Sequence, residues 1–384
     1  MSERTIDLAV PALSELRDRR SEKWALFDPD VLSMTVAEMD FPVAPAIRHA
    51  LIATIERSDL GYGIPAPRTL RAALAEFAGR RLNWAIDTEQ VTVVPDVMVG
   101  LIELCRVIAG PGGAVGFATP AYPPFFGELG SAGLRVVPVG LAPDGSVDLG
   151  ELDAALEGGI KAFILSNPHN PTGRVLPRAE LEAIAERCAA RGAWVLADEI
   201  HAPLVLPGAT HLPWLEVSDA ARRCGIALTS ASKAFNLAAL KTAFVVTADP
   251  RARALAESAG PQHEHASLLG EIAAEVAFRE ADEWLDAVIG QLGRNRSQLA
   301  AELRKQLPAV RWRPPQATYL AWLDCRGLEL DGEPAEVFLH RGRVALGAGL
   351  DYGAPGAGHA RLNFATSPQH LTEAIVRMTT AIRR

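Results

Sequence analysis

The residues from about Ile47 to Phe278 alternate between short apolar runs and longer helical patterns. Seven runs have the length and composition of buried strands: VTVV at 91–94, GGAVGFA at 112–118, LRVVPV at 134–139, KAFILS at 161–166, AWVLAD at 193–198, IALTS at 226–230 and TAFVVT at 242–247. This alternation predicts an α/β fold in which helices cover both faces of a mostly parallel, seven-stranded sheet. Ligands of such sheets collect at the carboxyl ends of the strands.

The pattern changes after Glu283, where the long helical stretch EWLDAVIGQLGRNRSQLAAELRKQL begins. It leads into a terminal α+β segment with strands expected near 318–324 and 360–364. A chain of 384 residues exceeds the size at which a single core stops growing. We therefore expect a large domain of residues 46–285 and a small α+β domain that combines residues 1–45 with 286–384. No flexible linker separates them in the sequence, so the two domains should pack together.

Charge and composition exclude several classes of function. A net charge of −8, a pI near 5.7 and the lack of a basic run argue against a nucleic-acid partner. No apolar window has the length of a membrane span, so we expect a cytoplasmic protein that acts on a small molecule. The His263–His265 pair has no third ligand nearby, which predicts no metal. Four cysteines are far apart and are expected to be buried thiols: Cys105, Cys188, Cys224 and Cys325.

Three polar segments follow three of the apolar runs. They are SNPHNPTGR at 166–174, Asp198 at the end of AWVLAD, and TSASKAFN at 229–236. Each has an ordinary explanation when taken alone, because Asn-Pro and Thr-Gly are common in turns and an aspartate often caps a helix. Lysine, however, is scarce: the chain has only five, and Lys233 lies among small residues at a strand end.

Taken in order, these segments resemble the fold-type I enzymes that depend on pyridoxal 5'-phosphate (PLP), the aspartate aminotransferase superfamily. Within that superfamily the chain is similar to the C–S lyases of the MalY/PatB cystathionine β-lyase type. The residues that carry this second likeness are Lys23-Trp24, AEMDFP at 37–42, SNPHNPTGRV at 166–175, DEIH at 198–201, SKAFNL at 232–237, EWLDA at 283–287 and ATYLAW at 317–322. The resemblance implies the PLP-dependent transferase fold of type I.

The resemblance also implies a role for each of four residues. Lys233 would bind PLP covalently and then act as the base that removes the substrate Cα proton. Asp198 would keep the pyridine nitrogen protonated, and Asn170 would donate a hydrogen bond to the ring oxygen. Arg361 would grip the substrate α-carboxylate through a two-pronged contact, although a surface ion pair is the plain alternative for such an arginine.

The phosphate of PLP would lie at the start of a helix after the run at 91–94. Val97 and Met98 would donate through their backbone N–H groups, and Ser230 and Ser232 would add hydroxyls. Aminotransferases usually carry a phosphate-binding arginine eight residues after the PLP lysine, whereas this chain has Lys241. That lysine keeps the positive charge but lacks the planar guanidinium that can bind a phosphate through two hydrogen bonds. This difference slightly weakens the aminotransferase alternative.

Three further side chains are expected at the site. Tyr122 would stack on the PLP ring, although a core tyrosine would look the same in the sequence. His201 stands where aspartate aminotransferases have a tyrosine, as in the lyase group, and would contact the cofactor or the leaving group or only pack beside the ring. Tyr62 matches a tyrosine that reaches the phosphate from the neighbouring subunit, which implies a homodimer with active sites at the interface; an ordinary turn aromatic is the alternative.

The resemblance implies a C–S β-lyase. Its reaction would be the α,β-elimination of L-cystathionine or another S-substituted L-cysteine to a thiol, pyruvate and ammonia. A PLP-dependent aminotransferase is the main alternative, because it uses the same lysine, aspartate and arginine. A regulatory protein on the same fold is a weaker alternative, since a decayed site should have lost some of Lys233, Asp198, Asn170 and Arg361.

Overall fold

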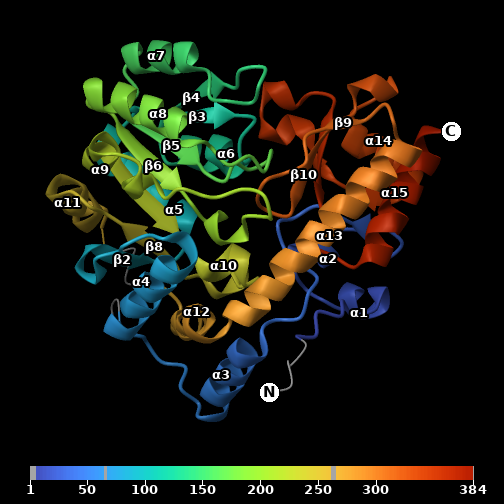
Figure 1. Cartoon of the computed structure of the whole chain (residues 1–384), viewed down its shortest axis with the longest axis horizontal. Coiled ribbons are helices and arrows are strands. Elements are labelled where there is room, and N and C mark those ends of the chain that lie inside the picture. The colour runs from blue at the N-terminus through green and yellow to red at the C-terminus, as the bar shows by residue number, and fades with distance from the viewer. Residues whose placement is uncertain (1–5, 65–66, 261–264, 384) are drawn as a thin grey trace.

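The computed structural model describes residues 6–64, 67–260 and 265–383 (Figure 1). Each of the seven apolar runs forms a strand of one sheet: β2 Val91–Val94, β3 Ala114–Thr119, β4 Arg135–Gly140, β5 Ala162–Ser166, β6 Trp194–Asp198, β7 Gly225–Thr229 and β8 Ala243–Val246. The strand order is β2-β8-β7-β6-β5-β3-β4, and only β8 runs antiparallel to its neighbours. The prediction of a mostly parallel, seven-stranded sheet is confirmed.

Helices bury both faces of this sheet. Along β5, Phe163 and Leu165 belong to one apolar cluster, and Ala162 and Ile164 belong to the other. This alternation is why the strands are apolar throughout. The first cluster includes side chains of α4 Arg68–Leu82, α7 Leu149–Glu157, α8 Arg178–Ala190, α9 Asp219–Cys224 and α12 Leu268–Glu280. The second includes side chains of α5 Val97–Ala109, α6 Pro124–Ser131 and α11 Pro250–Ser258.

The predicted long helix is α13 Asp282–Gln306, which runs diagonally from the sheet toward the C-terminal elements (Figure 1). A second, four-stranded antiparallel sheet has the order β12-β13-β10-β9. Its strands are β9 Arg311–Trp312, β10 Leu320–Asp324, β12 Gly347–Ala348 and β13 His359–Asn363. The helices α14 Pro334–Gly342 and α15 Pro368–Ile382 pack together beside it.

The N-terminal segment joins this C-terminal part of the molecule. Strand β1 Leu32–Ser33 pairs in parallel with β11 Val344–Ala345. The short helices α1 Leu13–Arg17 and α2 Glu22–Ala25 precede it, and α3 Pro45–Glu56 follows. In Figure 1, α3 projects from the lower edge of the molecule. The domain boundaries at residues 45 and 285 remain a prediction.

Candidate active site

The carboxyl ends of the parallel strands surround a cavity of about 310 Å³, a size typical of small-molecule sites. Segments that follow β2, β3, β5, β6 and β7 all contribute to its wall. Nine of the twelve site residues predicted from the sequence line the cavity: Val97, Met98, Tyr122, Asn170, Asp198, His201, Ser232, Lys233 and Lys241. The topology of the sheet thus brings together residues that are far apart in the chain.

A larger cavity of about 820 Å³ lies beside α4, but it offers no comparable chemistry. Its three arginines are already paired with carboxylates: Arg80 with Asp282, Arg81 with Asp286 and Arg178 with Glu182. The smaller cavity is lined by Lys233 and Asp198, neither of which forms an ion pair with another described residue, and it is therefore the candidate active site.

Lys233 belongs to the single-turn helix α10 Ala231–Ala234, which directly follows β7. Its Nζ donates a hydrogen bond to the Ala37 carbonyl oxygen at 3.2 Å. Burial, followed by the charge of Arg361, lowers the pKa of Lys233 to about 8. A lysine with a lowered pKa is neutral in part of the molecules near physiological pH, which is what a nucleophilic or basic lysine requires.

Asp198 ends β6 and is buried at the wall of the same cavity. Its Oδ1 accepts a hydrogen bond from the Ile200 backbone N–H at 3.2 Å. Burial raises the pKa of Asp198 to about 6, and the Ile200 N–H and the charge of Lys233 offset this only in part. A buried carboxylate in this position is suited to a cationic ligand group, such as a protonated pyridine nitrogen.

Asn170 and Arg361 are bonded to each other beside the cavity. The Arg361 Nη1 donates to the Asn170 Oδ1 at 3.1 Å, and its Nη2 donates to the Thr35 carbonyl oxygen at 3.3 Å. Arg361 is buried on β13, and its guanidinium lies 5.1 Å from the centre of the Tyr352 ring. Its Nε has no partner, and no carboxylate among the described residues pairs with it. Arg361 itself does not line the cavity, but its free charge is suited to a substrate carboxylate.

His201 and Tyr122 are the other two ring-bearing residues of the wall. Burial lowers the pKa of His201 to about 3, so this imidazole is neutral at physiological pH, and its Nδ1 has no partner in the described structure. Burial raises the pKa of Tyr122 to about 12, so its hydroxyl keeps the proton. Tyr122 packs edge-on against Phe125 at a centroid distance of 5.7 Å.

The first turn of α5 forms the opposite end of the cavity. Its Asp96 caps the helix by accepting the Val99 N–H at 2.7 Å, and its other carboxylate oxygen lies 2.8 Å from Lys241 Nζ. Sequence reasoning missed Asp96, although an aspartate directly before a helix is a standard capping signal. Ser230 does not line the cavity, because its hydroxyl donates to the Thr242 carbonyl oxygen at 2.6 Å.

Tyr62 is remote from this cavity within its own chain. Its side chain is fully exposed on the segment after α3, and it is absent from the cavity wall. The sequence also did not reveal the contribution of Ala37, whose backbone oxygen contacts Lys233. No side-chain pattern signals such a carbonyl, since every residue has one.

Several other expectations concern groups outside the cavity. All four cysteines are buried and free, as predicted. His263 lies outside the described residues, and the described part of the chain contains no group of three His, Cys, Asp or Glu side chains arranged to hold a metal. Among the described helices, none is both long enough and apolar enough to cross a membrane.

The free groups of the cavity fit PLP. Asp198 has no ion-pair partner among the described residues, and Lys233 has a lowered pKa. Val97 and Met98, in the first turn of α5, line the cavity, and N–H groups of a first helical turn lack intrahelical acceptors. The Asn170 Oδ1 is taken by Arg361, which leaves the amide Nδ2 as the donor for a ligand oxygen. Each group matches a part of the cofactor: the ring nitrogen, the aldehyde, the phosphate and the ring oxygen.

The family model for class I and II aminotransferases matches residues 29–378. The chain belongs to this family. Among the family's curated members, it is 40% identical over 397 residues to the "Putative cystathionine beta-lyase" of Mycobacterium leprae (strain TN), with 96% of each chain covered. It is 35% identical to the cystathionine beta-lyase of Corynebacterium glutamicum, with 98% of this chain and all of the relative covered.

A solved structure of the same family supports the fold. The crystal structure of a "putative plp-dependent beta-cystathionase" from Corynebacterium diphtheriae has a TM-score of 0.94, with 34% identity over 98% of this chain and 100% of that one. The predicted PLP-dependent transferase fold of type I is confirmed, as is the likeness to cystathionine β-lyases within the class I and II aminotransferase family.

Proposed function

We propose that this protein is a PLP-dependent C–S β-lyase, which converts L-cystathionine or another S-substituted L-cysteine to a thiol, pyruvate and ammonia. The observation that carries the proposal is one cavity that is lined by Lys233, with its lowered pKa, and by Asp198, which has no ion-pair partner among the described residues. The relatives named cystathionine beta-lyase, at 35–40% identity over nearly the whole chain, supply the reaction class.

PLP supplies an electron sink that stabilises negative charge on the substrate Cα. Lys233 would hold the cofactor, and its Nζ, when neutral, would accept the substrate Cα proton. Asp198 would supply the negative charge for the ring nitrogen, and Asn170 would donate a hydrogen bond to the ring oxygen. The proton that Lys233 Nζ accepts from Cα would then be available to protonate the departing thiolate.

Substrate orientation depends on Arg361 in this proposal. No carboxylate among the described residues forms an ion pair with Arg361. Contacts with Asn170, Thr35 and the Tyr352 ring fix the plane of its guanidinium group. A planar guanidinium binds a carboxylate through two parallel hydrogen bonds. The α-carboxylate of the substrate would occupy this position, with Cα toward Lys233.

Substitution Arg361→Lys is expected to raise the KM for L-cystathionine about 10- to 100-fold, because a hydrogen bond to a charged group contributes about 1.5–3 kcal/mol. The introduced lysine cannot form the two parallel hydrogen bonds of a guanidinium. The change in kcat should be smaller, because the substitution leaves the proton-transfer groups in place. Steady-state pyruvate release at varied substrate concentration measures both constants. An unchanged KM would show that Arg361 does not bind the carboxylate.

An aminotransferase is the alternative that the family itself keeps open. The two activities differ in products, because transamination converts an amino donor to a 2-oxo acid that retains its side chain, whereas elimination also releases a thiol. Incubation of the PLP-loaded enzyme with L-cystathionine and with L-alanine separates them. The lyase proposal expects thiol and pyruvate in equal amounts from cystathionine, and no transfer of the alanine amino group to an added 2-oxo acid.

The homodimer also belongs to the proposal. Five large apolar side chains are exposed on α3 and the segment after it: Ile52, Ile55, Leu60, Tyr62 and Ile64. An exposed cluster of this kind on the projecting helix in Figure 1 is typical of a protein interface. We assign it to a second copy of this chain, whose cavity would receive Tyr62.

We also propose that the protein is located in the cytoplasm, because it has a net negative charge and is proposed to act on a small molecule.

Subunit mixing tests the role of Tyr62. Protein that carries Lys233→Ala is expected to restore activity to protein that carries Tyr62→Ala, because a hybrid dimer has one site with both residues intact. Random exchange should give about one quarter of the parent activity, since half of the dimers are hybrids with one good site. If Tyr62 served its own chain, no mixture would exceed the activity of the Tyr62→Ala protein.

A further inference from the structure

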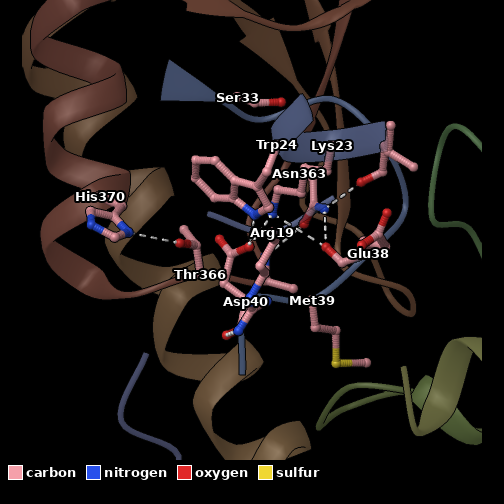
Figure 2. Close-up of polar contacts among 12 residues, drawn as sticks. Arg19, Lys23, Trp24, Ser33, Glu38, Met39, Asp40, Asn363, Thr366 and His370 are labelled. Carbon is pink, nitrogen blue, oxygen red and sulfur yellow. Dashed lines mark hydrogen bonds and ion pairs between the residues drawn. The ribbon is translucent and has the colours of Figure 1, made fainter. Parts of the chain in front are cut away.

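Lys23 and Asp40 form a fully buried ion pair outside the cavity (Figure 2). Both side chains have no exposed area, and the Lys23 Nζ lies 2.9 Å from the Asp40 Oδ1. The same carboxylate oxygen accepts the Trp24 Nε1–H at 3.0 Å, whereas Oδ2 has no partner among the described residues. A desolvated pair with one unsatisfied oxygen contributes little net stability, so its value must lie in the geometry that it imposes.

That geometry concerns the backbone of residues 35–40, here called the strap. Lys23 Nζ also donates to the Glu38 carbonyl oxygen at 3.3 Å. Asn363 on β13 donates its amide to the carbonyl oxygens of Val36 and Glu38, both at 2.6 Å. These contacts hold the strap against the C-terminal part of the molecule, as Figure 2 shows for Lys23, Glu38 and Asn363.

The other side of the strap is bound to the segment that carries Lys233. Asn236 accepts the Met39 backbone N–H at 2.8 Å and donates its amide to the Met39 carbonyl oxygen at 2.9 Å. Asn236 lies three residues after Lys233 and has a φ of 59°, a conformation that asparagine tolerates better than most residues. The strap is therefore fixed between Lys23 and Asn363 on one side and the Lys233 segment on the other.

Two carbonyl groups of the strap accept hydrogen bonds from two basic side chains, those of Arg361 and Lys233. The Thr35 oxygen accepts from Arg361 Nη2 at 3.3 Å, and the Ala37 oxygen accepts from Lys233 Nζ at 3.2 Å. The Ala37 oxygen also accepts the Tyr319 hydroxyl at 2.9 Å. A shift of the strap would move both carbonyls together, because they are only two residues apart in the same short, bent segment.

We infer that Lys23 and Asp40 are positioning residues of the active site, which act through the strap to aim the Ala37 oxygen at Lys233 and the Thr35 oxygen at Arg361. The inference rests on the proposed function for the roles of Lys233 and Arg361, but not on the fate of the sulfur. Neither Lys23 nor Asp40 touches the cavity.

The double variant Lys23→Met/Asp40→Asn tests this role. Removing both charges avoids leaving one buried and unpaired, so the thermal midpoint should stay close to that of the parent. We expect kcat/KM for L-cystathionine to fall about 100-fold, the scale of a displacement of about 1 Å at a site. A milder variant, Trp24→Phe, removes only the Nε1 bond to Asp40 and should show the same changes at a smaller scale.

The decisive readouts are those that a purely structural role would leave unchanged. In the PLP-loaded enzyme, the pH midpoint of the cofactor's visible absorbance and the dissociation constant of PLP should both shift, and KM should rise more than kcat falls. The matched control is Arg187→Met/Asp153→Asn, which removes a partly exposed ion pair of 3.2 Å between α7 and α8. This control should keep the parent values in all of these measurements.

Parent values of KM and of the absorbance midpoint in the folded double variant would overturn the inference. If the double variant does not fold, parent values in Trp24→Phe would overturn it instead. Failure of the proposed function gives a different result: the parent enzyme would release no thiol from cystathionine, while the absorbance midpoint would still shift in the variants.

Discussion

Substitution Lys233→Ala is expected to abolish thiol and pyruvate release from L-cystathionine. The kcat should fall at least about 10⁴-fold, the upper end of what one positioned proton-transfer group contributes. The physical reason is that the Lys233 Nζ is the amine of the cavity wall whose lowered pKa and contact with the Ala37 oxygen prepare it for proton transfer. Covalent binding of PLP should be lost as well, which mass spectrometry after borohydride reduction detects.

Lys305→Ala is the matched control for this prediction. Lys305 is exposed in the last turn of α13, so its removal should leave both activity and PLP attachment unchanged. Covalently bound PLP in the Lys233→Ala protein, together with substantial activity, would overturn the assignment of the lysine.

The second large effect is expected from Asp198→Asn. This substitution keeps the shape but removes the buried negative charge at the cavity wall, so the cofactor nitrogen loses its counter-charge. We expect kcat to fall about 10³-fold, similar to the loss of one preorganised electrostatic group, and PLP to bind more weakly. The control Asp331→Asn removes an exposed carboxylate that pairs with Arg341 and should change neither. Parent kinetics in Asp198→Asn would contradict the proposed role.

The same substitution should stabilise the protein when PLP is absent. The pKa of Asp198 is raised from 3.8 to about 6, so the folded chain binds the proton more tightly than the unfolded chain. The contribution of Asp198 to the free energy of unfolding is therefore largest below pH 4. It decreases by about 3 kcal/mol as the pH rises through 6. At pH 7 the cofactor-free Asp198→Asn protein should therefore unfold at a higher denaturant concentration than the cofactor-free parent. An equal or lower midpoint would contradict this.

The sheet was predictable because its strands are buried on both faces. Runs such as 161–166 are apolar without a break, and the structure forms β5 Ala162–Ser166 within one residue of that prediction. The alternation also predicts helices between the strands, and α8 Arg178–Ala190 lies between β5 and β6 as expected. The antiparallel direction of β8 was not predictable from the residues, since an apolar run carries no information on strand direction.

The site was predictable where side-chain chemistry decides it. Lys233, Asp198 and Asn170 follow three neighbouring strands, so parallel order alone places them at one edge. The backbone oxygens of Thr35 and Ala37 could not be found in this way, because their role depends on how the strap packs on Asn236 and Asn363. The burial of the Ser230 hydroxyl against Thr242 likewise follows from the local fold and not from the residue type.

The most direct test of the account is the reaction of PLP-loaded enzyme with L-cystathionine, followed by separate assays for pyruvate and free thiol. The proposed β-lyase predicts sustained release of both in equal amounts, with no added 2-oxo acid, and loss of both in the Lys233→Ala protein. Release of neither from cystathionine or any other S-substituted cysteine, with amino-group transfer to an added 2-oxo acid instead, would contradict it and identify an aminotransferase.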